Sequence, residues 1–103
     1  MFESFSEYDV FNNIRAQKAF ISSFGIHIKA GLTSGSFFAS SIRKKIISSS
    51  EKTILLAESS KFGKIEWAHF ADVKEVDIII TDTGISNDYI NFFNELEIPI
   101  IIV

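Results

Sequence analysis

Residues 54–63 read Ile-Leu-Leu-Ala-Glu-Ser-Ser-Lys-Phe-Gly, and this stretch decides the predicted fold. A short apolar run stops abruptly at small, polar and cationic residues and is closed by Gly63. The pattern predicts a buried strand that presents Ser59, Ser60 and Lys61 at its C-terminal end. In open α/β sheets, ligands bind at that end of the strands. We therefore expect a binding site there.

Three other apolar runs predict further strands. Residues 78–80 (Ile-Ile-Ile) and 99–103 (Pro-Ile-Ile-Ile-Val) show no alternation of polar and apolar side chains, and residues 19–21 (Ala-Phe-Ile) form a weaker run. Unbroken β-branched runs fit strands that are covered on both faces, as in parallel sheets. The sequence therefore predicts a mostly parallel, open sheet.

Helical patterns lie between these runs. Phe38, Ile42 and Ile46 recur at a spacing of four, and basic residues occupy the opposite face. A second apolar stripe within residues 89–96 follows Ser86, which suits the N-cap of a helix. Helices that alternate with strands are typical of an α/β fold with a mostly parallel sheet and flanking helices. We interpret residues 1–103 as one domain.

Two segments are read from weaker patterns. Residues 64–77 admit two interpretations, a short strand around Ile65 and Trp67 or a helical turn at residues 71–76. At the N-terminus, apolar side chains recur every three residues, which predicts a first helix that carries Phe5, Tyr8, Phe11 and Ile14.

Composition narrows the class of protein. The 103 residues carry a formal net charge of -3, 47% apolar residues, two histidines and no cysteine. This charge disfavours an autonomous DNA-binding surface. The absence of cysteine rules out disulfides and disfavours structural zinc, so we expect neither a metal nor a cofactor. No apolar run approaches the ~20 residues that cross a bilayer, so we expect a cytoplasmic protein with no membrane contact.

Lys61, Ser59 and Ser60 are the first candidate binding residues. A lysine directly after a strand end could neutralise a phosphate or carboxylate and hydrogen-bond to it. The alternative is a solvated turn lysine, which the spacing alone favours because lysines are mostly exposed.

Residues 31–36 (Gly-Leu-Thr-Ser-Gly-Ser) form a predicted loop before the helix that carries Phe38. Small residues, hydroxyls and free backbone N–H groups at a helix start suit anion binding. The residues alone favour an ordinary capping loop, with Ser34 or Ser36 as the N-cap, because capping is their usual role.

Asp82 lies in the segment Thr81-Asp82-Thr83-Gly84, directly after the strand predicted at residues 78–80. Its carboxylate could accept hydrogen bonds from sugar hydroxyls. It could equally shape an Asx turn that leads into the next helix. Both interpretations stay open.

The two histidines carry no recognisable catalytic or metal-binding motif. His27 and His69 each lie between apolar residues, and neither has a cysteine, histidine or carboxylate at ligand spacing. Because catalytic and metal-binding histidines need a partner group, we expect both to have packing or surface roles.

Four segments together resemble the C-terminal half of the sensor domain of DeoR-family bacterial transcriptional repressors. They are residues 18–26, 31–33, 54–63 and 77–82, in this order and spacing, and the likeness extends over nearly the whole chain. The resemblance implies a Rossmann-like fold similar to ribose-5-phosphate isomerase and glucosamine-6-phosphate deaminase. It also implies a domain that senses a phosphorylated sugar.

The resemblance implies a set of effector-binding residues, namely Lys61, Ser59 and Ser60 for the anionic or polar part of the ligand, Thr33, Ser34 and Gly31 as pocket lining, and Arg43 as an added positive charge. Family members bind DNA through an N-terminal helix-turn-helix. These 103 residues contain neither that motif nor the preceding half of the sensor, so we expect a fragment or truncated product that binds no specific DNA.

Two segments depart from the family pattern. Residues 22–25 read Ser-Ser-Phe-Gly where members commonly read Gly-Ala-Asp-Gly, so Phe24 replaces a carboxylate. Residues 37–39 read Phe-Phe-Ala in place of the acidic run that usually follows Gly-Leu-Thr.

Three functions are compatible with these observations. The leading hypothesis is the effector-sensing and oligomerisation part of a DeoR-type regulator. A sugar-phosphate isomerase or deaminase needs a positioned acid and base, and Glu58 and Asp82 are the two carboxylates next to predicted strand ends, so we favour a non-enzymatic function. A self-association module is the third hypothesis, because eleven phenylalanines predict an exposed apolar face. We expect a homo-oligomer.

Overall fold

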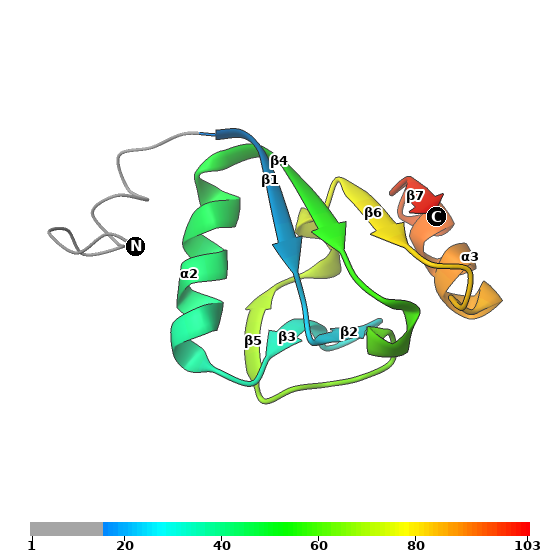
Figure 1. The fold of residues 1–103 in the computed structure, drawn as a ribbon, viewed down its shortest axis with the longest axis horizontal. Helices are drawn as coiled ribbons and strands as arrows, with labels where there is room; N and C mark the ends of the chain where they lie inside the picture. The colour runs from blue at the N-terminus through cyan, green and yellow to red at the C-terminus, as the bar shows by residue number, and fades with distance from the viewer. Residues whose placement is uncertain (1–15) are drawn as a thin grey trace, which may run out of the picture.

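The computed structural model describes residues 16–103, which form two sheets and two α-helices (Figure 1). Sheet A contains β1 (Ala16–Ser22), β4 (Ser50–Leu56), β6 (Ile78–Thr81) and β7 (Ile100–Ile102), all parallel and in the order β1-β4-β6-β7. The predicted parallel sheet is thus confirmed, and each of the four apolar runs supplies one strand. The predicted first helix lies outside the described residues.

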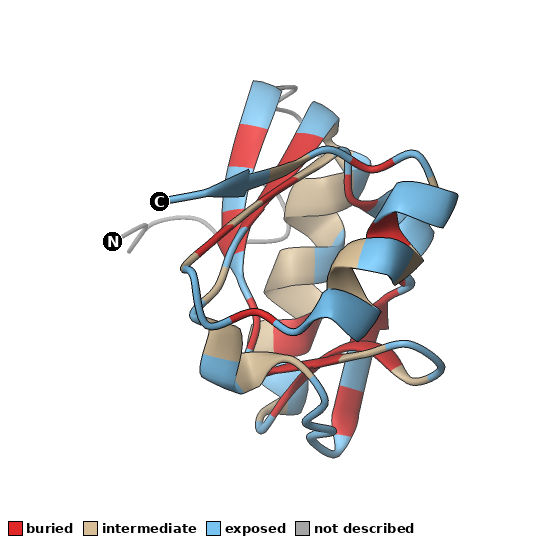
Figure 2. Ribbon diagram, turned by 90° about the vertical axis from the view of Figure 1, so that its right-hand side faces the viewer, coloured by how far each residue is buried: buried red, intermediate tan, exposed pale blue. Residues whose placement is uncertain are grey.

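The register of sheet A places one apolar row against the core. Ile21, Leu55, Ile79 and Ile100 pair in sequence across the four strands, so their side chains share one face. Leu55 and Ile79 are completely buried. The same core cluster includes side chains from the second sheet and from the last helix, namely Ile26, Leu32, Phe70 and Phe93. Figure 2 shows that the buried segments lie mostly in the strands.

The two helices begin where the sequence predicts. Helix α2 (Phe37–Ser48) starts after Ser36, whose Oγ accepts a hydrogen bond from the backbone N–H of Ala39 at 3.2 Å. Helix α3 (Asn87–Glu95) starts after Ser86, whose Oγ accepts from the backbone N–H of Tyr89 at 3.4 Å. Both N-cap predictions are therefore confirmed. Two short 3-10 helices, η1 (Ser59–Lys61) and η2 (Val73–Glu75), complete the helical elements of this part of the chain.

A second, antiparallel sheet was not predicted. Sheet B contains β2 (Gly25–His27), β3 (Gly31–Ser34) and β5 (Ala68–Ala71) in the order β2-β3-β5. The predicted loop at residues 31–36 is therefore wrong over its first four residues, which form a fully buried strand. A Cβ atom at Gly25 would collide with Oγ1 of Thr33, so the pairing of β2 with β3 requires glycine there.

Residues 64–77 contain one element from each of the two interpretations, although the strand is displaced. The strand runs over Ala68–Ala71 instead of around Ile65 and Trp67, which are both exposed. The predicted helical turn is confirmed as η2, in which Asp72 and Glu75 form a capping box. The prediction misplaced the strand because pairing with β3 fixes its position. Local alternation of polar and apolar residues does not.

The opposite face of sheet A is partly uncovered. Ser22, Leu56, Ile80 and Ile101 pair in sequence across the sheet and so share that face. Leu56 is 40% exposed and Ile101 is 47% exposed. Parallel sheets in α/β proteins are normally covered on both faces. We call this row, together with Phe20, the outer face of sheet A.

The two neighbouring leucines of β4 test which face of the sheet carries the stability. Leu55→Ala should lower the free energy of unfolding by about 3 kcal/mol, because it leaves a cavity in a closed core. Leu56→Ala removes the same atoms from the outer face and should cost less than half as much. Urea denaturation of both variants measures the difference, and equal losses would contradict the assignment of the two faces.

Candidate ligand-binding site

A cavity of about 440 Å³ opens at the C-terminal ends of β1, β4 and β6. We call it the Lys61 cavity. Its walls are formed by Ser22, Ser23, Phe24, Leu56, Ala57, Glu58, Lys61, Ile80, Thr81, Asp82 and Val103. The stretch 54–63 therefore delivers its polar end to a cavity at the edge of the sheet where α/β proteins bind ligands. Its volume falls within the range of small-molecule sites.

Asp82 fixes the backbone that leads to Lys61. Its Oδ2 accepts a hydrogen bond from the backbone N–H of Ser59 at 2.8 Å, which joins the end of β6 to η1. Its Oδ1 accepts from the backbone N–H of Gly84 at 2.8 Å, which is the geometry of an Asx turn. A Cβ atom at Gly84 would lie 2.5 Å from Oγ of Ser59, so this approach requires glycine. Of the two interpretations of Asp82, the structure shows the Asx turn.

Hydrogen bonds also perturb the acidity of Asp82. The side chain of Ser59, followed by the backbone N–H groups of Ser59 and Gly84, lowers the pKa of the Asp82 carboxyl below its usual 3.8. These donors stabilise the ionised form, so the carboxylate is the form that holds η1 in place.

The segment after Lys61 is anchored from the other side. The backbone N–H of Gly63 donates to the carbonyl of Ile26 at 2.6 Å, and the hydroxyl of Tyr89 donates to the same carbonyl at 3.4 Å. The ring of Phe62 packs edge-on against Tyr89 and Phe93, with centroids 5.4 and 5.9 Å away. Lys61 therefore extends from backbone that is fixed on both sides.

The Lys61 ammonium lies over an aromatic ring. Its Nζ is 5.7 Å from the centroid of Phe24, which is within the range of a cation–π contact. Within residues 16–103, no carboxylate forms an ion pair with this ammonium. A cation that lines a cavity without an acidic partner can bind an anionic ligand group there.

Thr81 adds a polar atom that sequence analysis did not single out. It is the last residue of β6 and lines the Lys61 cavity, yet it is only 3% exposed. Its Oγ1 is buried and has no hydrogen-bond partner in the described part of the chain. Buried hydroxyls are normally paired, so an unpaired one in a cavity wall marks a place where a ligand or water can supply the partner. A threonine at a strand end was the available signal.

Arg43 also contacts the Phe24 ring. Its Cζ is 5.8 Å from the Phe24 centroid and 5.6 Å from that of Phe70. Its Nε donates to the carbonyl of Ser22 at 2.9 Å, and desolvation lowers its pKa. It lines a separate cavity of about 320 Å³, which we call the Arg43 cavity and which is lined by Phe24, Ser34, Gly35, Ser36, Ala39, Arg43 and Glu66.

The remaining predicted site residues are not gathered around Lys61. Ser59 is held by Asp82, and Ser60 is exposed outside the lining of the Lys61 cavity. Thr33 is buried in β3, where its Oγ1 accepts from the backbone N–H of Glu66 at 2.8 Å and donates to the carbonyl of Gly25 at 3.4 Å.

Ser34 and Gly31 line other cavities. Ser34 faces the Arg43 cavity, whereas Gly31 lines a third cavity of about 310 Å³ beside η2. Gly31, Thr33 and Ser34 were expected together in one loop. They lie instead along the strand β3, which explains why they do not meet at one cavity.

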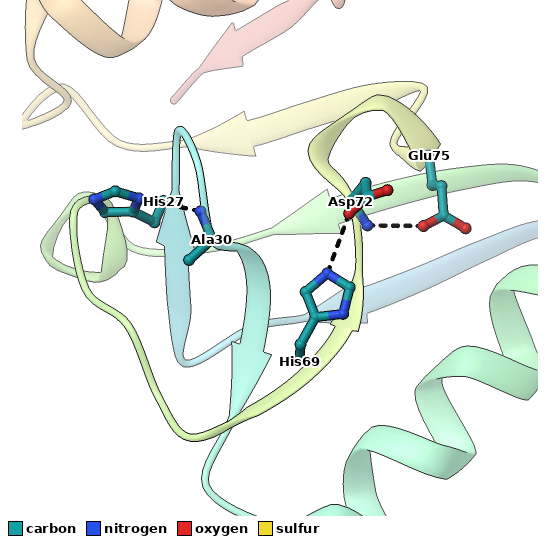
Figure 3. Close-up of polar contacts among 5 residues, drawn as sticks. All are labelled: His27, Ala30, His69, Asp72 and Glu75. Carbon is teal, nitrogen blue, oxygen red and sulfur yellow. Dashed lines mark hydrogen bonds and ion pairs between the residues drawn. The ribbon is translucent and has the colours of Figure 1, made fainter.

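The histidines do not line the Lys61 cavity. Nδ1 of His27 accepts hydrogen bonds from the backbone N–H groups of Lys29 and Ala30, at 3.0 and 3.2 Å. Nε2 of His69 lies 3.2 Å from Oδ1 of Asp72 (Figure 3). His69 is exposed, which fits the expected surface role, and Asp72, three residues later, is its partner. Within residues 16–103, no three histidine, aspartate or glutamate side chains gather as a metal site would require.

Comparison with known proteins identifies the family. The family model described as the DeoR C terminal sensor domain matches residues 2–83. The chain belongs to this family. None of the helices in residues 16–103 is long and apolar enough to span a bilayer.

The relatives of this sensor-domain chain are DNA-binding regulators. It is 30% identical over 81 residues to the deoxyribose operon repressor of Escherichia coli K12, which covers 79% of this chain and 32% of that protein. It is 32% identical over 83 residues to the regulator IolR of Bacillus subtilis, covering 81% and 33%. It is 35% identical over 68 residues to the regulator YulB of the same species, covering 66% and 26%. The chain thus spans about a third of the length of these relatives.

Asp82→Asn tests the link between β6 and η1. Because the folded-state pKa of Asp82 is lowered, its carboxylate contributes stability above the usual pKa of 3.8 and loses it as the pH falls through the folded value. The wild type should therefore lose stability more steeply than Asp82→Asn below about pH 5. Thermal melts across this range measure the slopes.

Glu51→Gln is the matched control, because it removes an exposed carboxylate from β4, away from the link between β6 and η1. It should leave the acid slope unchanged. Parallel curves for the wild type and Asp82→Asn would contradict the structural role of this carboxylate.

Proposed function

We propose that this chain is the ligand-sensing part of a DeoR-type transcriptional regulator, and that it binds a phosphorylated sugar in the Lys61 cavity. The observation that carries the proposal is the Lys61 ammonium, which forms no ion pair within residues 16–103, at the C-terminal edge of a parallel sheet and in a cavity that also contains carboxylates. An ammonium suits the phosphate, whereas carboxylate and hydroxyl oxygens suit the sugar hydroxyls.

The proposal gives a role to several side chains that line the cavity. Lys61 would bind the phosphate, and the unpaired Oγ1 of Thr81 would gain a partner from the ligand or its water. Glu58 is exposed at the rim and would accept hydrogen bonds from hydroxyls. The apolar side chains of Leu56 and Ile80 form a floor for the carbon skeleton. This mixture of apolar wall and few polar groups is typical of small-molecule sites.

The comparisons support the sugar class. One relative is named as the repressor of a deoxyribose operon, which makes a pentose derivative a reasonable first ligand to test. In a regulator, the ligand would favour one arrangement of the sensor over another, and this shift would change the affinity of an attached helix-turn-helix for its operator. DNA would be contacted only by that other part of such a protein.

The carboxylates of the cavity favour binding over catalysis. Proton transfer needs an acid or base that is free to reach the substrate. Both oxygens of Asp82 already accept backbone hydrogen bonds, which leaves Glu58 without a second positioned group. This arrangement supports a sensor and disfavours the sugar-phosphate isomerase alternative.

The uncovered face of sheet A supports a second proposal, self-association. A groove of about 360 Å³ lies beside the outer face, and its lining includes Phe20, Phe38, Ile42 and Ile46. Phe38 is 69% exposed. Contiguous exposed apolar surface of this kind marks interaction sites in soluble proteins. A second copy of the chain would cover this groove, which shares only Ser22 with the lining of the Lys61 cavity.

Lys61→Gln tests ligand binding directly. Thermal shift with ribose 5-phosphate, 2-deoxyribose 5-phosphate and fructose 6-phosphate should show stabilisation of the wild type by at least one of them. Lys61→Gln should weaken that affinity by about tenfold or more, because a charge-assisted hydrogen bond is lost. Lys64→Gln, an exposed lysine three residues away, is the control and should bind as the wild type does. Retained affinity in Lys61→Gln, or no response to any sugar phosphate, would refute the proposal.

Light scattering after size-exclusion chromatography tests self-association. The wild type should show a mass above that of the 11.6 kDa monomer at high concentration. Phe38→Lys places a charge in the groove and should shift the chain toward the monomer. Ile65→Lys changes another exposed apolar side chain, outside sheet A and the groove, and should not. A wild type that stays monomeric at every concentration rules out this second proposal.

A further inference from the structure

Phe24 lines the Lys61 cavity but has no role in the proposed binding of a sugar phosphate. It lies in the connection between β1 and β2, and its backbone N–H donates to the carbonyl of Thr33 at 3.3 Å. Its ring is 49% exposed, although it lines two cavities. An aromatic side chain that is fixed at its backbone and exposed at its ring is placed to contact a ligand.

The ring contacts two cations. The Lys61 ammonium lies 5.7 Å from its centroid and lines the Lys61 cavity, and the Arg43 guanidinium lies 5.8 Å from it and lines the Arg43 cavity. Lys61 and Arg43 can therefore be no farther apart than the sum of these two distances. Neither of these two cavities is lined by both cations, and Phe24 lines both cavities.

We propose that Phe24 determines the specificity of this sensor, because its ring confines the ligand to the Lys61 cavity and so selects sugars with a single phosphate. This inference rests on the proposed function. A bisphosphorylated sugar has a second anionic group that needs a second cation. Arg43 is the other cation that contacts the Phe24 ring, and Phe24 is the residue that the linings of the Lys61 cavity and the Arg43 cavity share.

Two features keep Arg43 from replacing Lys61 in this role. Its Nε and Nη2 already donate to the carbonyl and hydroxyl of Ser22, at 2.9 and 3.4 Å. Its guanidinium also packs against a second ring, Phe70, at 5.6 Å from the centroid. Arg43 is therefore a weaker anion-binding group than Lys61. A ligand reaches it only when it extends beyond the Lys61 cavity.

The inference predicts a change of specificity in Phe24→Ala. Isothermal titration calorimetry should compare fructose 6-phosphate with fructose 1,6-bisphosphate, and ribose 5-phosphate with ribose 1,5-bisphosphate. The wild type should bind the bisphosphate of a pair no more tightly than the monophosphate. In Phe24→Ala, the ratio of the two affinities should move about fivefold toward the bisphosphate, because Arg43 becomes accessible to the second phosphate.

Further variants test whether the change of specificity in Phe24→Ala depends on Arg43. Adding Arg43→Gln to Phe24→Ala should abolish the gain, whereas adding Lys44→Gln, which removes an exposed cation from the same helix, should keep it. Phe24→Leu shortens the side chain and should give a smaller shift in the same direction, so it carries the test if the alanine variant does not fold.

The outcomes separate the two proposals. If the wild type binds a monophosphate but the ratio in Phe24→Ala is unchanged, the role of Phe24 is refuted and the sensor proposal stands. If the wild type already prefers the bisphosphate, the role of Phe24 is likewise refuted. If the wild type binds neither any of the four sugars nor 2-deoxyribose 5-phosphate, the proposed function is refuted, and the inference about Phe24 is refuted with it.

Discussion

The position of Lys61 depends on one carboxylate. Asp82 joins the end of β6 to η1 through a 2.8 Å hydrogen bond to the backbone of Ser59, two residues before the lysine. Because β4 and β6 are parallel neighbours, their C-terminal ends lie side by side, and this cross-link ties the chain after β4 to the end of β6. Without it, the segment that carries Lys61 would lose one of its two anchors and keep the one between Gly63 and Ile26.

The sheet could be predicted because its sequence signal is local. Residues 54–56 and 78–80 are unbroken apolar runs, and no other element explains such runs as well as a buried parallel strand. The helix starts were readable for the same reason, since Ser36 and Ser86 each cap the backbone N–H three residues ahead. The position of Lys61 near the edge of the sheet could be predicted because the residue closely follows one of these strands.

Sheet B could not be predicted, because its strands are defined by their partners. β2 has three residues, among them Gly25 and His27, and neither residue favours a strand. Its formation depends on close contact with β3, which in turn buries Thr33 and Ser34. Lys61 therefore lines a cavity at the edge of the sheet where a binding site was expected, whereas Gly31, Thr33 and Ser34 were expected in a loop that the structure replaces with a strand. Nothing local indicates that the hydroxyl of Thr81 lacks a partner.

The central claim is that an anionic ligand binds at the C-terminal edge of sheet A through Lys61. A crystal structure of the chain with the sugar phosphate that stabilises it most tests this claim most directly. The account predicts a phosphate oxygen about 2.8 Å from Nζ of Lys61, within the Lys61 cavity. A phosphate bound in the cavity beside Gly31 and Lys74, with Lys61 still over the Phe24 ring and without a ligand, would contradict it.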